Sequence, residues 1–113
     1  MTTPTQLDDK IFVTGQIAPE DMRALAEQGF RSVIGNRPDG EEPGQPTWEE
    51  LSAAAQEAGL EARLIPIASA DDLEARKSEF AQATAQMPGP ILAFCRTGTR
   101  SARLYEAAQD HRK

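Results

Sequence analysis

The sequence predicts an α/β domain of three layers, α/β/α, around a mostly parallel sheet of four to five strands. Three observations support this class. Short apolar segments alternate with longer segments of helical periodicity, the order expected of parallel strands joined by crossover helices. One segment, Ile91–Phe94, is apolar throughout, as in a central strand covered on both faces. Glycine and proline separate most of these segments from one another.

The first part of the chain predicts a flexible start, two strands and the helix between them. Residues 1–9 are polar and contain threonine and proline, so we expect them to be flexible. Ile11–Thr14 alternates and predicts a short strand at an edge of the sheet. Pro19 and the two acidic residues after it suit the first turn of a helix, which Gly29 would end. Residues 30–35 then predict the second strand.

The second part repeats this order. Thr47 and Glu50 match a capping box at the start of a helix that Gly59 would end, and residues 60–67 predict the next strand. Residues 69–72 predict the start of another helix, running to about residue 86. The last strand is followed by a helix over residues 99–109. Because ligands bind at the carboxyl ends of parallel strands, we expect the site at that edge of the sheet.

Composition limits the classes of function. With 113 residues and 39% hydrophobic content, residues 1–113 form one domain with one modest core. The net charge of −6 argues against nucleic-acid and membrane partners. Residues 88–113 nevertheless carry +3 and the remainder −9, so a local positive field favours a small anionic ligand. One cysteine and one histidine, His111, exclude a structural zinc site, and we expect no metal or organic cofactor. Without a disulfide, an apolar leader or a membrane-length segment, we expect a cytoplasmic protein.

The only cysteine, Cys95, stands where the last strand passes into a polar loop. An isolated free cysteine is most often a small buried side chain that ends a strand. Here two arginines, a glycine and three hydroxyl side chains follow it. A cysteine that only packs in the core would need none of these residues. Backbone N–H groups of such a loop, backed by a helix N-terminus, can surround an anion and stabilise a thiolate. The residues predicted to bind substrate are Arg96, Thr97, Gly98, Thr99, Arg100 and Ser101.

The wider pattern resembles a known family. Residues 7–15, Gly29–Ile34, Asn36–Gly40 and Cys95–Ser101 are similar to a bacterial family of phosphatase-like sulfurtransferases. Domains of that family also occur fused to metallo-β-lactamase-like enzymes that oxidise persulfides. The resemblance implies the tyrosine-phosphatase fold, with Cys95 as the nucleophile, and a persulfide-oxidising enzyme as a partner.

Loop length distinguishes two chemistries on this scaffold. Tyrosine phosphatases place five residues between cysteine and arginine, whereas four separate Cys95 from Arg100, as in single-domain rhodaneses. Phosphatases also usually carry histidine before the nucleophile, where this chain has Phe94. Both differences favour a sulfur ligand over a phosphoryl group. Ser101, by contrast, matches the hydroxyl residue that follows the arginine in phosphatases.

A phosphatase needs a carboxylic acid to protonate the leaving oxygen. The candidates are Asp39, Asp71 and Asp72, each with a competing structural role. Asp71 and Asp72 fit the first turn of a helix, and Asp39 fits an ordinary Pro-Asp-Gly turn. Nearby Arg37 has two candidate roles, binding an anion or only solvating its loop, and we favour the second.

The sequence therefore predicts a sulfurtransferase. In this hypothesis Cys95 takes sulfane sulfur from thiosulfate or a persulfide, carries it as a cysteine persulfide and passes it to a thiol, while Arg100 orients the donor. The first alternative is a tyrosine or dual-specificity phosphatase that uses Cys95, Arg100 and one of the three aspartates. The second is a non-catalytic partner domain of a persulfide-oxidising system.

Overall fold

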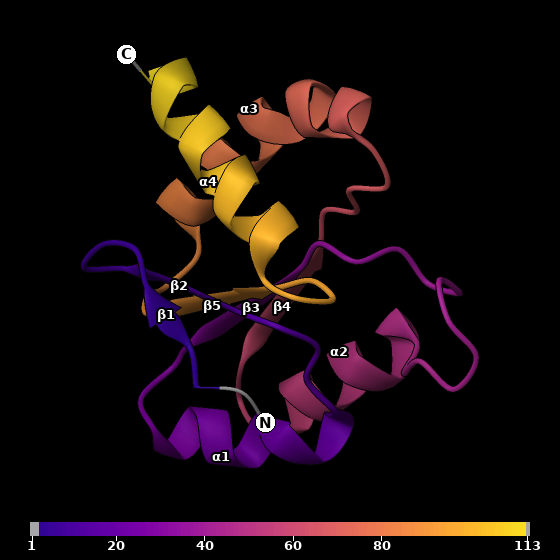
Figure 1. The fold of residues 1–113 in the computed structure, drawn as a ribbon. Helices are drawn as coiled ribbons and strands as arrows, with labels where there is room; N and C mark the ends of the chain where they lie inside the picture. Colours follow the sequence, from indigo (N-terminus) through magenta and orange to yellow (C-terminus); the bar gives the residue numbers. More distant parts are fainter. Residues whose placement is uncertain (1–2, 113) are drawn as a thin grey trace.

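The computed structural model describes residues 3–112, and for residues 110–112 it describes the backbone alone. The expected flexibility of residues 1–9 therefore lies partly outside the described residues, since residues 1 and 2 are not among them. The chain forms a five-stranded sheet with α-helices on both sides, which confirms the predicted α/β class (Figure 1). Its strands are β1 (Thr5–Gln6), β2 (Ile11–Thr14), β3 (Ser32–Gly35), β4 (Glu61–Leu64) and β5 (Ile91–Phe94).

The strands lie in the order β1-β2-β5-β3-β4. Strands β2 to β5 are parallel, and β1 runs antiparallel to β2. The predicted edge position of Ile11–Thr14 was wrong, because β1 covers that side of β2. The Asp8 carboxylate accepts hydrogen bonds from the backbone N–H groups of Lys10 (2.8 Å) and Ile11 (2.7 Å). This side-chain turn reverses the chain and allows residues expected to be flexible to form a hairpin.

The helices are α1 (Met22–Glu27), α2 (Trp48–Glu57), α3 (Ala70–Gln86) and α4 (Thr99–Arg112), and a 3₁₀ turn, η1 (Pro19–Asp21), precedes α1. Helices α3 and α4 cover one face of the sheet, and α1 and α2 cover the other (Figure 1). The capping box predicted at α2 is confirmed: the Thr47 hydroxyl accepts from the Glu50 N–H at 3.1 Å, and the Glu50 carboxylate accepts from the Thr47 N–H at 3.1 Å.

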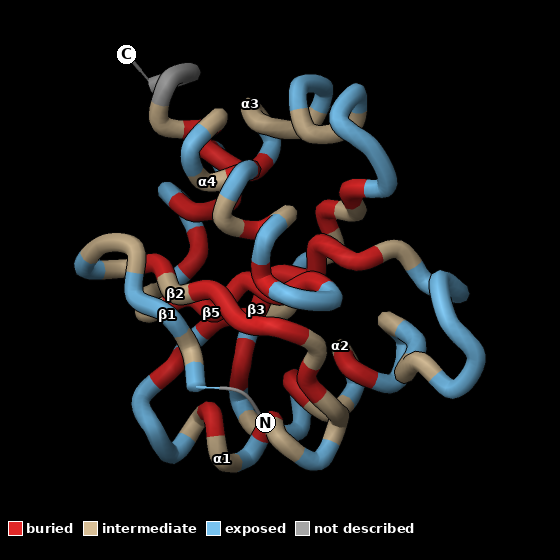
Figure 2. Tube along the Cα trace, viewed as in Figure 1, coloured by how far each residue is buried: buried red, intermediate tan, exposed pale blue. Residues whose placement is uncertain are grey.

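Strand β5 passes through the middle of the domain and is buried at every residue. Its alternate side chains serve two cores, with Ile91 and Ala93 facing α3 and α4 and Leu92 and Phe94 facing α1 and α2. Figure 2 shows the buried trace concentrated in the sheet and on the inner sides of the helices. A strand packed on both faces has little freedom to shift, so β5 fixes the position of the cysteine that follows it.

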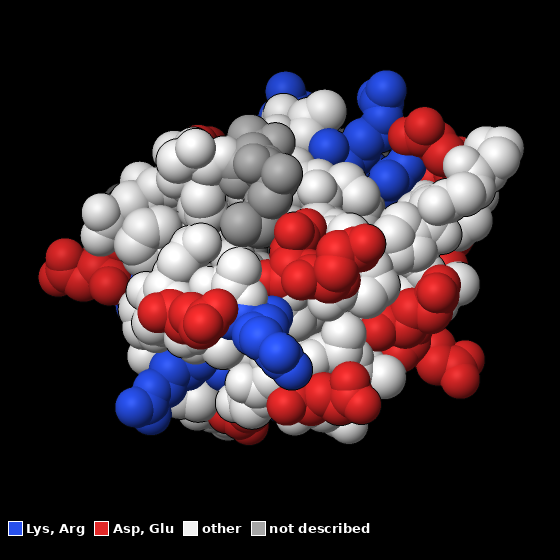
Figure 3. All heavy atoms as spheres, turned by 90° about the horizontal axis from the view of Figure 1, so that it is seen from below, with Lys and Arg blue, Asp and Glu red and all other residues white. Residues whose placement is uncertain are grey.

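The outer surface agrees with the acidic composition. Figure 3 views the side of the molecule formed by α1 and α2, where acidic side chains are spread over the visible face. No helix among the described residues is long and apolar enough to cross a membrane.

Candidate active site

The loop that carries Cys95 lies at the carboxyl edge of the sheet, between the ends of two neighbouring strands. Strand β5 ends at Phe94 and α4 begins at Thr99, so the loop turns back within four residues. Gly98 has a φ of 91°, in the left-handed region that favours glycine. The chain after β2 approaches closely, because a Cβ on Gly15 would lie 3.0 Å from the Arg96 carbonyl oxygen. The compact loop therefore favours glycine at two positions, at Gly98 within the loop and at Gly15 in the segment packed against it.

The Cys95 side chain is fully buried, and its sulfur accepts a hydrogen bond from the Gly98 N–H at 3.0 Å. Burial raises the pKa of the thiol, as it does for any group that ionises to an anion. The backbone N–H groups of Ser101, Thr97 and Arg100, with the Ser101 hydroxyl, lower it further than burial raises it. The net effect lowers the pKa of Cys95 from its ordinary value, which favours the nucleophilic thiolate.

Ser101, in the first turn of α4, joins the cysteine loop to Asn36, which directly follows β3. Its hydroxyl donates to the Asn36 side-chain oxygen at 2.8 Å, and the Asn36 amide donates to the Ile65 carbonyl at 2.9 Å. Ser101 and Asn36 are fully buried. Since buried polar groups are stable only when paired, this chain of hydrogen bonds fixes α4 relative to two strands.

Arg100 is held by the loop that follows β3. The Glu41 carboxylate accepts from Arg100 Nη1 at 2.8 Å and from Nη2 at 2.9 Å, and the Ile67 carbonyl accepts from Nη1 at 2.8 Å. Hydrogen bonds from Arg100 are the main cause that lowers the pKa of Glu41 to about 2, and Arg37 also lowers it. Glu41 is therefore ionised at any physiological pH.

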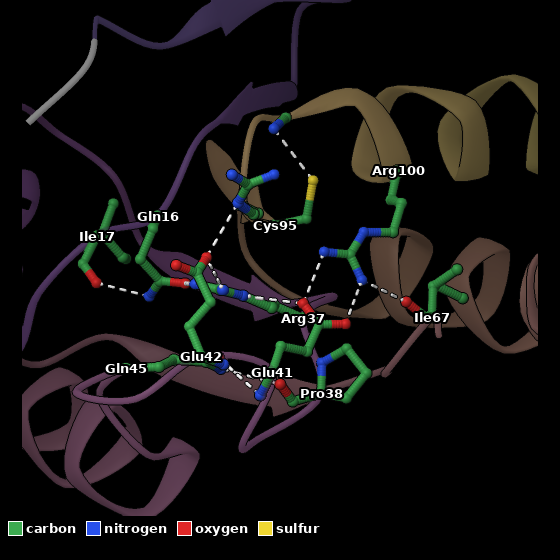
Figure 4. A network of polar contacts seen from close by, with 12 residues as sticks. Gln16, Ile17, Arg37, Pro38, Glu41, Glu42, Gln45, Ile67, Cys95 and Arg100 are labelled. Atoms are coloured by element: carbon green, nitrogen blue, oxygen red, sulfur yellow. Dashed lines mark hydrogen bonds and ion pairs between the residues drawn. The ribbon is translucent and has the colours of Figure 1, made fainter. Parts of the chain in front are cut away.

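Glu41 belongs to a chain of five alternating charges, Arg100–Glu41–Arg37–Glu42–Arg96 (Figure 4). Its middle member, Arg37, is buried and donates to Glu41 at 2.9 Å, to Glu42 at 2.6 Å and to the Gln16 side chain at 3.0 Å. The interpretation of Arg37 as a solvating residue was wrong. Buried arginine is stable here because three acceptors replace the water that it loses.

Sequence reasoning missed both Glu41 and Glu42. Their ion-pair partners Arg96 and Arg100 lie more than fifty residues further along the chain. The available signal was the position of both segments after parallel strands, which brings them to one edge of the sheet. Sequence position did not show that these glutamates, rather than the candidate aspartates, would reach the arginines.

The three candidate aspartates have structural partners or an exposed position. The Asp39 carboxylate accepts from the Trp48 N–H at 2.8 Å, in the first turn of α2. The Asp72 carboxylate accepts from the Ala68 N–H at 2.8 Å, while the Ser69 hydroxyl caps α3. Asp71 lies exposed in the first turn of α3. No hydrogen bond or ion pair among the described residues links these three to Cys95 or Arg100.

The remaining loop residues differ in exposure. Gly98 is buried, whereas Thr97 and Thr99 are exposed and their hydroxyls lie 3.1 Å apart. Phe94, which stands where phosphatases usually carry histidine, is buried and stacks on Trp48 with ring centroids 6.4 Å apart. Trp48 thus belongs to the packing beneath the site.

A hollow of about 490 Å³ opens beside the loop. Its lining consists of Arg37, Glu41, Glu42, Ala68, Arg96 and Arg100. The hollow has a net positive charge, because its three guanidinium groups outnumber its two carboxylates. The described residues contain no group of three histidine, cysteine or acidic side chains placed to hold a metal ion. The hollow therefore suits a small anion bound by protein donors.

A central parallel strand that delivers a cysteine into a loop closed by arginine and a helix N-terminus defines a phosphatase-like α/β domain. A family model, described as the phosphatase-like domain of beta-lactamase hydrolase-like protein, matches residues 5–111. This chain belongs to that family, which confirms the family resemblance read from the sequence.

The curated relatives are longer proteins. The chain is 39% identical over 100 residues to the beta-lactamase hydrolase-like protein of Agrobacterium fabrum, covering 88% of this chain and 23% of that protein. It is 35% identical over 103 residues to the protein of the same description from Xylella fastidiosa Temecula1, covering 91% of this chain and 24% of that one. The chain thus spans about a quarter of the length of each of these relatives.

Solved structures agree with the fold. A Neisseria meningitidis protein, nma1982, described as a candidate phosphatase, is 32% identical with a TM-score of 0.81, covering 88% of this chain and 71% of that one. Tk-PTP, in a glycine-to-alanine mutant form, is 16% identical with a TM-score of 0.60, covering 97% of this chain and 81% of that one. The second likeness concerns the fold alone, and it confirms the predicted tyrosine-phosphatase-like architecture.

Proposed function

We propose that this domain is a cysteine-dependent phosphatase that hydrolyses small phosphate monoesters through a phosphocysteine on Cys95. The observation that carries the proposal is the lowered pKa of a cysteine held in an N–H-lined loop beside Arg100. The family model and the nma1982 neighbour, both described in terms of phosphatases, support the same chemistry.

The reaction has two steps. The Cys95 thiolate attacks phosphorus, the bond from phosphorus to the ester oxygen breaks, and the departing oxygen leaves as an anion that takes a proton from water. Water then attacks the phosphocysteine, and phosphate leaves as the thiolate is restored. Arg100 and the loop N–H groups stabilise the charge on the non-bridging oxygens in both transition states.

The arrangement of carboxylates limits the substrates. Asp39 and Asp72 accept backbone hydrogen bonds, and Glu41 is ionised between two arginines. None of these three carboxyl groups is therefore poised to donate a proton to the leaving oxygen. Asp71 is exposed in the first turn of α3 and, within the described part of the chain, has no hydrogen bond to Cys95 or Arg100. Substrates whose leaving group needs little protonation, such as aryl phosphates, fit this site better than alkyl phosphates.

Sulfur transfer is the second candidate, and the four-residue spacing between Cys95 and Arg100 favours it. In that reaction the thiolate attacks the outer sulfur of thiosulfate, the sulfur–sulfur bond breaks and sulfite leaves. The resulting cysteine persulfide gives its outer sulfur to an acceptor thiolate, and Cys95 is restored. Sulfite needs no proton to leave, which agrees with the structural roles of Asp39, Asp72 and Glu41. A persulfide-oxidising enzyme is the partner proposed for this second candidate.

One experiment separates the two candidates. Purified protein is incubated with p-nitrophenyl phosphate, and separately with thiosulfate and cyanide, with Cys95→Ser as the control. Phosphate release that requires Cys95, without thiocyanate, supports the phosphatase. Thiocyanate without phosphate release overturns it and supports sulfur transfer. If Cys95→Ser changes neither product and Cys95 gains no group by intact mass, both candidates are wrong and the domain is a binding module.

A further inference from the structure

The donors of Arg100 can be counted. A guanidinium group has five N–H donors in one plane. Glu41 takes one hydrogen from Nη1 and one from Nη2, and the Ile67 carbonyl takes the second hydrogen of Nη1. Two donors remain, on Nε and Nη2. They lie on the same edge of the group, which is the geometry that binds two oxygens of one oxyanion.

The remaining edge faces the nucleophile. In Figure 4 the Arg100 guanidinium lies between the Cys95 sulfur on one side and the Glu41 carboxylate on the other. Hydrogen bonding to Glu41 is the main cause that raises the pKa of Arg100, whereas burial lowers it. Cys95 also raises the pKa of Arg100, both by its charge and by a hydrogen bond. Glu41 and Cys95 therefore contact different parts of one guanidinium group.

Glu41 is itself held in place. Arg37, which is buried, donates from Nε to the same Glu41 oxygen that accepts from Arg100 Nη2. The backbone N–H of Glu41 donates to the Gln45 side-chain oxygen at 3.1 Å, and the Gln45 amide donates to the Pro38 carbonyl at 2.8 Å. A carboxylate fixed from two sides can orient the arginine that it contacts.

We propose that Glu41 is a positioning residue, which turns the Nε and Nη2 edge of Arg100 toward an oxyanion bound at Cys95. The proposal deepens the proposed function, because it rests on that function for the oxyanion and assigns the residue that prepares its binding site. The competing interpretation is that the Glu41 carboxylate occupies the substrate-binding site and must move away from Arg100 before an anion can bind. The two interpretations predict opposite effects of removing the Glu41 charge.

Binding of tungstate, an inert tetrahedral dianion, tests the proposal without turnover. Affinity is measured as protection of Cys95 from iodoacetamide at a fixed pH. Glu41→Gln is compared with Glu79→Gln, which removes an equivalent carboxylate from an Arg76 pair at 3.0 Å on α3. We expect Glu41→Gln to weaken tungstate binding by about 10-fold or more, because a charged hydrogen-bonded pair is lost. Glu79→Gln should stay within about 2-fold.

Arg100→Lys completes the design. Lysine keeps the positive charge but has no planar edge to orient, so adding Glu41→Gln to it should cause less than about a 3-fold further loss. The pH dependence of Cys95 alkylation without tungstate is measured for each variant, so that tungstate affinities are compared at the same fraction of thiolate.

Three results would overturn the positioning role: tighter tungstate binding in Glu41→Gln, an undiminished loss in the Arg100→Lys background, or no tungstate binding by the wild type. The proposed function fails separately. If tungstate binding follows the expected pattern and no phosphate ester is hydrolysed, Glu41 positions Arg100 for another oxyanion donor and the phosphatase proposal alone is wrong.

Discussion

Glu41 contacts Arg100 through both of its carboxylate oxygens, at 2.8 and 2.9 Å, across 59 residues of sequence. The contact joins the loop after β3 to the first turn of α4. Because Arg37 and Glu42 extend the same ion-pair chain to Arg96, the two loops at this edge of the sheet are connected at both ends of the cysteine loop. The site is therefore built from two loops, and its properties depend on residues of both.

Cys95 should react as a thiolate at lower pH than an ordinary cysteine. The pKa of Cys95 is lowered from its ordinary value, since N–H donors outweigh the effect of burial. We expect the rate of alkylation by iodoacetamide, plotted against pH, to rise with a midpoint below that of the unfolded protein. In guanidinium chloride the midpoint should return to the ordinary range. A native midpoint at or above the denatured one would contradict this prediction.

The same shift predicts how stability depends on pH. The folded pKa is lower than the unfolded one, so ionisation of Cys95 stabilises the fold fully above the unfolded pKa. This contribution is lost as pH falls through the folded pKa. The difference in free energy of unfolding between wild type and Cys95→Ser should grow between these two pKa values and then stay constant. Denaturant titrations at several pH values check it, and a difference that falls as pH rises would refute it.

Gly98→Ala should damage both stability and the thiolate. The residue has a φ of 91°, and an added Cβ would lie 3.3 Å from the backbone carbon of Thr14. We expect a loss of about 1–3 kcal/mol in unfolding free energy. We also expect a higher pKa of Cys95, because relief of the strain moves the Gly98 N–H that donates to the sulfur. Gly40→Ala is the control: its φ is 77°, but nothing lies within 4 Å of the added Cβ.

Gly40→Ala should therefore lose stability through backbone strain alone, by about 1 kcal/mol, with Cys95 ionisation unchanged. Equal shifts of the alkylation midpoint in both variants would show that the Gly98 contact with the sulfur is unimportant. The readouts are thermal unfolding for stability and the alkylation profile for the thiolate.

Asparagine substitutions separate the two roles considered for the aspartates. Asparagine keeps a side-chain oxygen that can accept the hydrogen bonds of Asp39 and Asp72, but it cannot donate a carboxylic acid proton. We expect Asp39→Asn and Asp72→Asn to keep kcat within about 3-fold of wild type on whichever substrate is turned over. A loss of about 100-fold or more in either variant would identify that residue as the acid.

Alanine at the same positions should instead reduce stability. Asp39→Ala removes the acceptor of the Trp48 N–H, and Asp72→Ala removes that of the Ala68 N–H. Each should cost about 0.5–2 kcal/mol, as measured for lost helix caps. An unchanged unfolding midpoint in both alanine variants would contradict the structural roles.

The sequence could predict those features of the fold that depend on neighbouring residues. The capping box at Thr47, the helix start at Pro19 and the strand at Ile91–Phe94 all follow from residues close together in the chain. The position of β2 inside the sheet depends on a two-residue strand, and two residues carry no periodicity to detect. Sheet order is a property of long-range packing, which explains the wrong edge assignment.

The same distinction applies to the site. Cys95 and its loop form a continuous segment and could be found by inspection, as could Arg100. The partner of Arg100 could not, because Glu41 and Glu42 stand beside each other among 18 acidic residues of the chain. The burial of Arg37 was equally hidden, since it depends on acceptors from two other segments, Gln16 and Glu41–Glu42.

Asn36→Asp should raise the pKa of Cys95 and destabilise the fold. The substitution keeps the shape of the side chain and its acceptor for the Ser101 hydroxyl, but it removes the N–H donor to the Ile65 carbonyl. A buried carboxylate next to that carbonyl, and linked to the thiolate through Ser101, opposes ionisation of the sulfur. We expect a loss of about 2–4 kcal/mol in unfolding free energy at neutral pH.

Ser101→Ala is the matched variant, since it removes the hydroxyl and adds no charge. It should move the alkylation midpoint upward by less than Asn36→Asp, because the backbone N–H of Ser101 still stabilises the thiolate. If Asn36→Asp leaves the midpoint unchanged while Ser101→Ala raises it, Asn36 only supports the strands and has no electrostatic effect on the nucleophile. A midpoint raised most by Asn36→Asp would show that the end of β3, and not only the cysteine loop, controls the reactivity of Cys95.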